Sequence, residues 1–399
     1  MTRAEISRAD LSEMAAAAGL SITGVTSGDP FPEVEGYLVD HVERGHLAGM
    51  DWFTTERARQ STKPWTLHDT VQSIVSVAVP FWSGYVEPPE DGILRGRIAR
   101  YAWGRDYHTT LKKRMRSLVT AIEQHLGRDV ESRVLVDTAR TVDRAVAARA
   151  GTGWYGKNSM IIVPGHGSWV MLGEIMLDIA IQPDLPLARD CGRCSICIDR
   201  CPTGAIVEPY RIDAPRCISY LTIEHRGVIP HELRPLMGDY VFGCDICQNV
   251  CPYTNAAKAI YDPDFAPASI DNAFPSLEWL STMTEEQFRA TYSGTPVTRA
   301  KRAGLARNAA IALGNSNDSR AEPILIDILA NHDQPLARGH AASALRNLLG
   351  DGSRRVLRDA IARDVDPYVR HEIQIALGDL PADIQWQPGL EAGAGPALT

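Results

Sequence analysis

The chain has 399 residues, enough for two or three domains and for a packed core that needs no disulfide bonds. Its composition, 44% hydrophobic and 23% charged, is typical of a soluble globular protein, and its net charge of −8 argues against nucleic-acid binding through global charge. Because no apolar run is long enough to span a membrane and the N-terminus has no signal-peptide or twin-arginine pattern, we expect a cytoplasmic protein without membrane association.

Residues 1–185 are predicted to form a mixed α/β domain. Strand-like apolar runs occur at 21–25, 73–80, 133–136 and 160–163, and we expect the last to form a hairpin with the apolar run that follows it. Apolar residues at helical spacing between 111 and 126 predict an amphipathic helix, and 141–150 predict another.

Asp137 ends the strand-like segment RVLVDT, beside a glycine-rich segment. A carboxyl group in such a place can serve as a general acid if burial raises its pKa, whereas the plain alternative is a helix N-cap for the residues that follow. Tyr107 and His108, in the aromatic segment YAWGRDYH, can donate hydrogen bonds in a pocket, although a lone histidine is more often structural.

The glycine-rich segment 151–158, GTGWYGKN, matches two nucleotide-binding patterns only superficially. The dinucleotide fingerprint must follow a strand, but this segment follows the helical AVAARA, and the phosphate loop needs Ser or Thr where Asn158 stands. Two alternatives remain: a helix C-cap with tight turns, or a loop whose amides and Lys157 face another polar cofactor.

All eight cysteines lie between 191 and 251, which predicts a cofactor-binding module over residues 186–255. The first run is C-x2-C-x2-C-x3-C-P and the second is C-x2-C-x3-C-P, as in two-cluster ferredoxins, where the cysteine before proline crosses to the other cubane cluster. One [4Fe-4S] cluster is therefore assigned to Cys191, Cys194, Cys197 and Cys251. The other is assigned to Cys201, Cys217, Cys244 and Cys247. The alternative is a pair of structural zinc sites.

The remaining chain divides into a connecting segment, 256–295, a helical segment, 296–380, and a tail, 381–399, predicted to be disordered. The dipeptide Ala-Leu recurs at 312–313, 344–345 and 376–377, which indicates stacked helical hairpins similar to HEAT repeats. Basic residues gather at the start of this segment. Lys301, Arg302 and Arg307 are candidate phosphate contacts, with an ordinary solvated helix face as the alternative.

Taken together, the segments RYAWGRDYH, VDTARTVDRAVAARAGTGWYGKNSMII, CGRCSICIDRCPTGAI, RCISYLTIEHRG and FGCDICQNVCPY resemble epoxyqueuosine reductase, in the same order and with the same split second cluster. The resemblance covers about 50–380. It implies a cobalamin-dependent iron–sulfur oxidoreductase that reduces epoxyqueuosine to queuosine at the tRNA wobble position, the final step of queuosine synthesis. No Asp-x-His-x-x-Gly motif is present, which fits a family that holds cobalamin base-off.

The same resemblance implies roles for individual residues. Asp137 matches the proton donor and lines the cobalamin, Ser219 and Asp245 match further cobalamin positions, and Ile161 and Leu172 are expected to contact it through their backbone. Arg226, in EHRG, falls where the family touches tRNA.

Two other classes of protein share some of these sequence features. A reductive dehalogenase also couples two cubane clusters to cobalamin, but such enzymes are typically exported and lack helical repeats. A plain electron carrier would not need the large α/β domain. We therefore expect tRNA and a low-potential electron donor as partners, and a monomeric enzyme.

Overall fold

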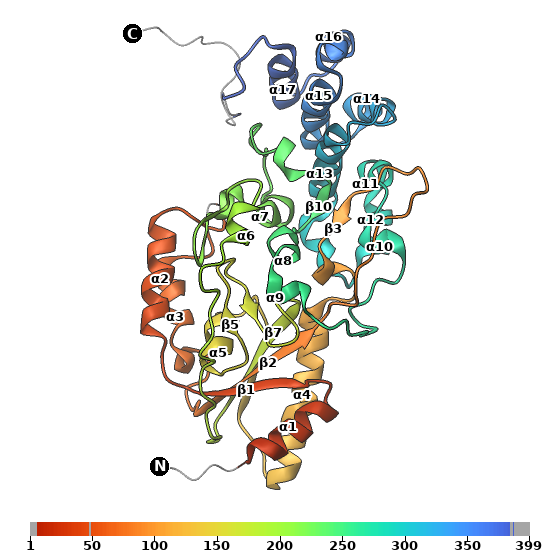
Figure 1. Cartoon of the computed structure of the whole chain (residues 1–399). Coiled ribbons are helices and arrows are strands. Elements are labelled where there is room, and N and C mark those ends of the chain that lie inside the picture. Colours follow the sequence, from red (N-terminus) through yellow and green to blue (C-terminus); the bar gives the residue numbers. More distant parts are fainter. Residues whose placement is uncertain (1–5, 48, 384–385, 387–399) are drawn as a thin grey trace. The chain divides into compact units, whose positions relative to one another are not determined.

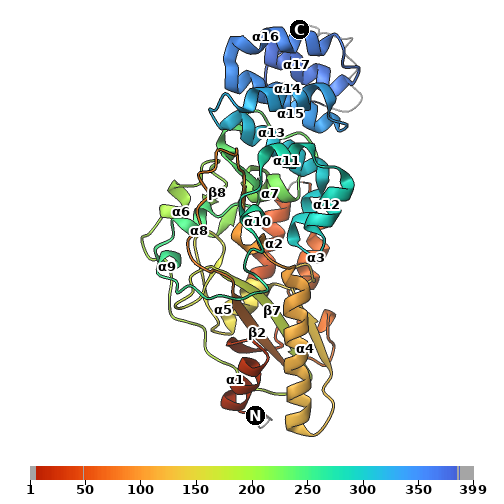
Figure 2. The ribbon, with the colours of Figure 1, turned by 90° about the vertical axis from the view of Figure 1, so that its right-hand side faces the viewer.

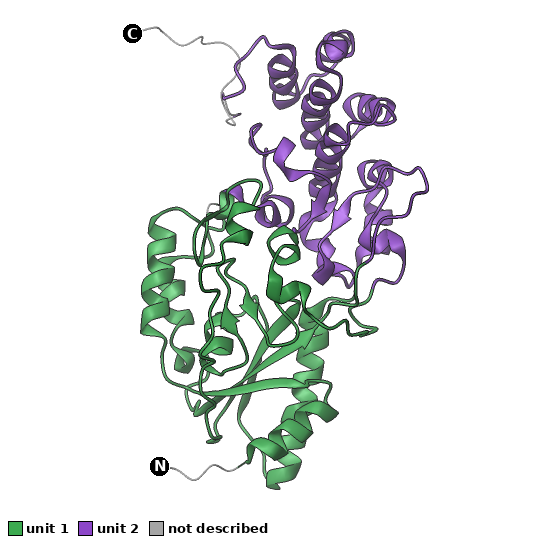
Figure 3. Cartoon of the chain, viewed as in Figure 1, with its two compact units in different colours: residues 1–85, 104–215, 245–266 green, residues 86–103, 216–244, 267–399 purple. Residues whose placement is uncertain are grey.

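The computed structural model describes residues 6–47, 49–383 and 386. The chain separates into two units, each built from three segments (Figure 3). Unit 1 comprises residues 1–85, 104–215 and 245–266, and unit 2 comprises residues 86–103, 216–244 and 267–399. The cysteine-rich segment 186–255 thus contributes to both units. The tail 381–399 lies almost entirely outside the described residues.

Unit 1 is built on a four-stranded antiparallel sheet with the order β1-β2-β7-β4 (Figure 1). Its strands are β1 (Ile22–Ser27), β2 (Ser73–Pro80), β7 (Val170–Leu177) and β4 (Ser132–Leu135). All eight residues of β2 are buried, as expected for a central strand with both faces covered. The predicted strands at 21–25, 73–80 and 133–136 correspond to β1, β2 and β4.

Helices cover both faces of this sheet. Helix α4 (Tyr107–Leu126) packs one face, where Met115 meets Gly173 of β7, and its buried stripe includes Leu111, Leu118 and Ile122. Helix α5 (Asp143–Arg149) covers the other face, where Val146 shares a core cluster with Ile74, Leu135 and Met176. The shorter elements of unit 1 are α1 (Arg8–Ala17), α2 (Pro32–Glu43), α3 (Thr55–Ser61), β5 (Trp154–Tyr155), β6 (Ile161–Ile162), α6 (Ile196–Asp199), β8 (Ile206–Glu208), β9 (Arg211–Ile212), α8 (Ile246–Asn249) and α9 (Pro252–Asn255).

The predicted hairpin between 160–163 and the apolar run after it is wrong. Strand β6 pairs with β5, so that Trp154 lies opposite Ile162, whereas β7 pairs with β2 and β4. An isolated antiparallel bridge, Val163 to Gly167, closes the turn between the two runs. The turn residues PGHGS made a local pairing attractive, but the long buried β7 gains more from two partners in the sheet.

Unit 2 consists mainly of helices around one core. The described elements are β3 (Arg97–Ile98), α7 (Ile218–Ile223), β10 (Tyr240–Phe242), α10 (Ile270–Ala273), α11 (Leu277–Thr282), α12 (Glu285–Tyr292), α13 (Lys301–Asn315), α14 (Ala321–Asn331), α15 (Pro335–Leu349), α16 (Arg354–Ile361) and α17 (Pro367–Leu377). The two short strands pair with each other in parallel. Val241 and Phe242 belong to the same core as the helices.

Helices α13 to α17 stack in succession (Figure 2), which confirms the predicted repeats. The three Ala-Leu dipeptides lie at corresponding places in α13, α15 and α17, and Leu313, Leu345 and Leu377 are buried in the shared core. Each repeat therefore covers the apolar face of its neighbour, as in solenoid proteins. Within the described part of the chain, no helix combines the length and the apolar character of a membrane span.

Candidate functional site

Asp137 follows the last residues of β4 in a backbone conformation that is rare for a residue with a side chain. Its φ is +44°, and such strain persists where the surroundings hold it, often at functional sites. It caps no helix: α5 begins at Asp143, its N-cap residue is Val142, and no side-chain hydrogen bond caps that end. The N-cap alternative for Asp137 is therefore wrong.

Two side chains from the start of α4 hold the Asp137 carboxylate. The Tyr107 hydroxyl donates a hydrogen bond of 2.5 Å to Oδ2, and His108 Nε2 lies 3.4 Å from the same oxygen. On its other side, His108 Nδ1 is 2.8 Å from Oδ1 of Asp106, the N-cap residue of α4. The prediction that these side chains donate hydrogen bonds is confirmed for Tyr107, whereas His108 Nε2 lies at ion-pair distance from Asp137 and has no hydrogen-bond partner among the described residues. Asp106 was not predicted, although its position two residues before His108 at a helix start was a usable signal.

The charges in this group determine where its proton lies. Burial lowers the pKa of His108, but contacts with Asp106 and Asp137 outweigh it and raise that pKa to about 9. Burial raises the pKa of Asp137, yet the contacts from His108 and Tyr107 prevail and lower it. At neutral pH the imidazolium therefore holds the proton beside an ionised Asp137. The Asp137 side chain is still 54% exposed, so a substrate can reach it.

The two predicted cobalamin contacts on the strands lie in one apolar cluster on the α5 face of the sheet. Ile161 of β6 is buried there and Leu172 of β7 is half-buried. Strand β4 ends at Leu135, which pairs with Glu174, so the turn that carries Asp137 follows β4 in the direction of Leu172 on antiparallel β7. A partly open aliphatic wall beside an acid fits the apolar edge and reacting face of a corrinoid. Asp245 is also in unit 1, whereas Ser219 is in unit 2.

Four cysteines line one cavity in unit 1, and they are the four assigned to the first cluster: Cys191, Cys194, Cys197 and Cys251. None of the eight cysteines, all of which the structure describes, forms a disulfide bond. Short loops carry the first three, and Cys251 comes from the end of the second run, just before α9. This arrangement fits the crossed ligation of a cubane cluster. Among the described side chains, no three His, Cys, Asp or Glu are grouped as tightly as a single metal ion requires.

The glycine-rich segment borders this cavity. Gly151 has a φ of +67° directly after α5, as in a helix C-cap, and no strand precedes it. Lys157 and Asn158 line the cysteine cavity, and the Lys157 ammonium donates 2.7 Å to the carbonyl of Gly192 in the first cysteine loop. The segment therefore ends a helix and then reaches the first cysteine loop, which supports the C-cap alternative; that its amides and Lys157 face a cofactor stays a prediction.

The other four assigned cysteines are divided between the units. Cys201 and Cys247 belong to unit 1, and Cys217 and Cys244 belong to unit 2. The Cys201 sulfur accepts the backbone N–H of Ala205 at 3.3 Å, an N–H···S contact that suits a ligand thiolate. The common role of these four cysteines stays a prediction.

The basic edge predicted at the start of α13 needs correction. Arg307 is 0% exposed, and its guanidinium donates to the carbonyls of Leu221, His225 and Gly227. Arg302 is largely buried and paired with Asp333 and Glu285. Neither can serve as a phosphate contact. Lys301 and Arg226 are exposed, so they remain candidates.

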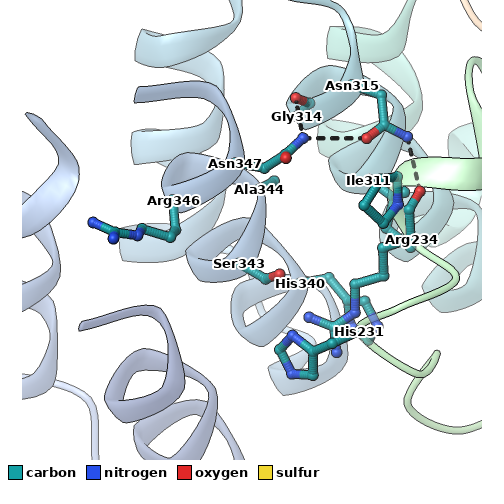
Figure 4. A pocket seen from close by; sticks show the side chains of 11 residues that line it. His231, Arg234, Ile311, Gly314, Asn315, His340, Ser343, Ala344, Arg346 and Asn347 are labelled. Atoms are coloured by element: carbon teal, nitrogen blue, oxygen red, sulfur yellow. Dashed lines mark hydrogen bonds between the residues drawn. The ribbon is translucent and has the colours of Figure 1, made fainter. Parts of the chain in front are cut away.

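A hollow in unit 2 is lined by residues of α13 and α15, and its polar side chains bond to one another (Figure 4). Asn347 donates to Gly314 and Asn315, and Asn315 donates to the carbonyl of Arg234. The Arg234 guanidinium forms a buried two-point pair with Glu372 at 2.8 and 2.9 Å. Because these polar groups are occupied by one another, the hollow is a seam between repeats. It contains none of the predicted site residues.

Comparison with known proteins places these features in one family. Family models match at residues 62–138 (epoxyqueuosine reductase QueG, DUF1730), 190–254 (4Fe-4S double cluster binding domain) and 298–378 (HEAT repeats). The epoxyqueuosine reductase of Bacillus anthracis is 34% identical over 90% of this chain and 93% of its own length. That of Pseudomonas aeruginosa is 39% identical over 79% and 87%.

Solved structures agree with this. A selenomethionine-labelled epoxyqueuosine reductase has a TM-score of 0.86 and 31% identity, covering 93% of this chain and 98% of the other. A complex of such an enzyme with an epoxyqueuosine-modified tRNA-Tyr stem loop has a TM-score of 0.85, with the same identity and coverage. A Bacillus subtilis enzyme, whose catalytic aspartate loop is swung out of the active site, also has a TM-score of 0.85. The chain belongs to the epoxyqueuosine reductase family, iron–sulfur oxidoreductases that use two [4Fe-4S] clusters and cobalamin.

Proposed function

We propose that this enzyme reduces the epoxide of epoxyqueuosine at the wobble position of tRNA to the alkene of queuosine, with loss of water. The observation that carries the proposal is the geometry of Asp137. This acid lies in a strained turn, and Tyr107 and His108 both contact one of its carboxylate oxygens. A relative solved with an epoxyqueuosine-modified stem loop supports tRNA as the substrate.

The proton donor acts on the oxygen that leaves. Opening an epoxide and expelling its oxygen requires protonation, since an alkoxide is a poor leaving group. Tyr107 and His108 both contact Oδ2 of Asp137, so we expect the substrate oxygen to meet Oδ1. In this state Asp137 is ionised, so it must take up a proton before it donates one, and the His108 imidazolium is a proton source in contact with it.

The cofactors supply the electrons. When bound, cobalamin provides a strongly reducing cobalt centre, and Asp137, Ile161, Leu172, Ser219 and Asp245 would hold it. The ligands of one cluster are Cys191, Cys194, Cys197 and Cys251, supported by their shared cavity. The ligands of the other are Cys201, Cys217, Cys244 and Cys247, supported by elimination among the eight cysteines.

Recognition of tRNA involves exposed basic groups of unit 2. Arg226 and Lys301 are exposed and can reach phosphates, whereas Arg302 and Arg307 are held by partners within the protein. We further place the enzyme in the cytoplasm, where its tRNA substrate is, as a monomer that receives electrons from a low-potential carrier.

A reconstitution experiment tests this function. Protein purified without oxygen is loaded with cobalamin, its iron and cobalt are counted, and it is given epoxyqueuosine tRNA with an excess of artificial reductant. We expect queuosine in the digested tRNA, detected by mass spectrometry, and a visible spectrum of bound corrinoid. A protein that carries both clusters and corrinoid yet leaves the epoxide intact would refute the proposal.

A further inference from the structure

A second carboxyl group, which the mechanism above does not use, is buried in the sheet next to the site. Glu174 of β7 is 0% exposed, and neither of its carboxyl oxygens has a hydrogen-bond partner among the described residues. Leu172 and Met176, two residues to either side, pack in the clusters beneath α5, so Glu174 projects into the same layer. An ionisable side chain buried without a partner costs stability, and an apolar residue would avoid that cost.

Other unpaired polar atoms surround Glu174 in this layer. Ser76 of β2 lies directly opposite Glu174, and its hydroxyl has no partner among the described residues either. Next in the same row comes Gly24 of β1, where a Cβ would come within 2.6 Å of the Thr152 hydroxyl, a third buried group with no partner in the described chain. Buried polar groups of this kind are ordinarily bridged by ordered water.

Asp143 connects this layer to Asp137. It is the first residue of α5, and its carboxylate is hydrogen-bonded by the backbone of Asp137. Burial, and then the charge of Asp137, raise the pKa of Asp143 to about 7. Burial, followed by the charges of Asp143 and Asp137, raises the pKa of Glu174 well above its ordinary value. The layer therefore stores protons near neutral pH.

The remaining charged and titratable groups around this layer are few. Arg144 of α5 faces Asp137 and Asp143 and favours their ionised forms, and Tyr155 of β5 has a pKa that burial raises to about 12, so it stays neutral. His108 of α4 meets Asp137 from its other side. No described cation contacts Glu174.

We propose that the buried Glu174 and the partly exposed Asp143 form a proton relay that returns protons to Asp137 during turnover, Glu174 passing its proton through Asp143. The inference rests on the proposed function. The reaction joins the epoxide with two electrons and two protons and yields the alkene and water. The electrons come from the clusters, and both protons end on the departing oxygen. Asp137 can give only one proton at a time, so it must be recharged within each turnover.

A relay from inside the sheet suits the geometry of the site. Tyr107 and His108 already occupy one Asp137 oxygen, and the exposed side of the carboxyl is where substrate must bind. With that side covered, bulk water cannot deliver the second proton directly. Glu174 lies in the buried layer beneath α5, so it does not compete with the substrate for the exposed side of the Asp137 carboxyl. Both act through Asp137 and are positioning residues in this scheme.

The first test measures protonation and needs neither cobalamin nor turnover. Infrared spectra of the protein at pH 7 should contain a carbonyl band of a protonated, buried carboxyl group. The nearly isosteric Glu174→Gln should lose the part of this band that Glu174 contributes and keep at most the part that comes from Asp143, while the exposed control Glu286→Gln should retain the whole band. An unchanged band in Glu174→Gln would overturn the relay, because Glu174 would then hold no proton to pass on.

The second test measures turnover of the loaded enzyme. The rate at which Glu174→Gln converts epoxyqueuosine tRNA should be about 10-fold lower than that of wild type, or lower still. Its rate should also fall more steeply above pH 7, and its solvent deuterium isotope effect should be larger. A small weak acid added to the buffer should restore part of the rate. If the wild type converts its substrate and Glu174→Gln matches its rate and pH profile, the relay is wrong and the proposed function stands. If the loaded wild type fails, the function itself is wrong.

Discussion

At the scale of single residues, the site consists of acidic groups whose pKa values, and hence protonation states, are determined by neighbouring side chains. The sequence predicted Asp137 from the strand end it occupies, and Tyr107 and His108 from their motif. Their contact across thirty residues depends on how α4 packs on the sheet, which no local pattern encodes. A signal for Glu174 was present, since it interrupts the apolar strand VMLGEIML, but a lone charge in a strand does not say which face it occupies.

The imidazolium of His108 should leave a signature in stability. Because the folded pKa of about 9 exceeds the ordinary 6.5, its ion pairs stabilise the fold fully below about pH 6.5, and this contribution disappears as pH rises through 9. We therefore expect His108→Gln to be less stable than wild type at pH 6, with the difference shrinking toward pH 9.5. Urea unfolding at several pH values measures this. A difference that stays constant with pH would contradict the ion-paired imidazolium.

At the scale of elements, the repeats were predictable but the orientation of their arginines was not. Periodic Ala-Leu pairs mark helices that stack, and α13, α15 and α17 do so. Charge patterning placed Arg307 on a solvated edge, yet it lies on the buried side of α13 and ties that helix to the segment 221–227. A guanidinium has five N–H donors and can satisfy several carbonyls at once. An arginine can therefore be buried on a helix face where only apolar side chains would be expected.

Replacing Arg307 should affect stability and spare the electrostatics of tRNA binding. Arg307→Met leaves buried carbonyls without donors, and we expect it to lower the free energy of unfolding by about 2–4 kcal/mol. Chemical denaturation checks this.

The matched control is the exposed Lys301→Ala, which should keep stability. It should lower the slope of log affinity for tRNA against log salt by about 0.7–0.9. A folded Arg307→Met that alone reduces the salt slope would restore Arg307 to the phosphate-contacting edge.

At the scale of the whole molecule, each unit is assembled from three separate chain segments. The family motifs predicted the catalytic fold, the cluster module and the repeats in order, because each has a spacing of its own. The exchange of segments between units was not predictable, since the Pro, Gly and charged residues at the start of the excursion 86–103 equally indicate an ordinary loop. The cysteines also depend on contacts between distant parts of the chain, because Cys251, at the far end of the module, lines the same cavity as Cys191 and Cys194.

Cys251 tests that crossing. Cys251→Ser should impair the cluster held by Cys191, Cys194 and Cys197, although Cys251 is distant from them in sequence. We expect iron to fall from roughly eight toward four atoms per chain, with one of the two paramagnetic resonance signals remaining. The counterpart is Cys247→Ser, which should remove the other signal. Loss of the same signal in both variants would contradict the assignment.

The most direct test of the central claim, that Asp137 protonates the departing oxygen, is single-turnover reduction of epoxyqueuosine tRNA by Asp137→Asn. Asn has nearly the same shape but cannot give up a proton, so the variant should keep its fold, clusters and corrinoid. Its rate constant should fall by about 10²–10⁴-fold relative to wild type. A variant with complete cofactors that forms queuosine at close to the wild-type rate would contradict the account.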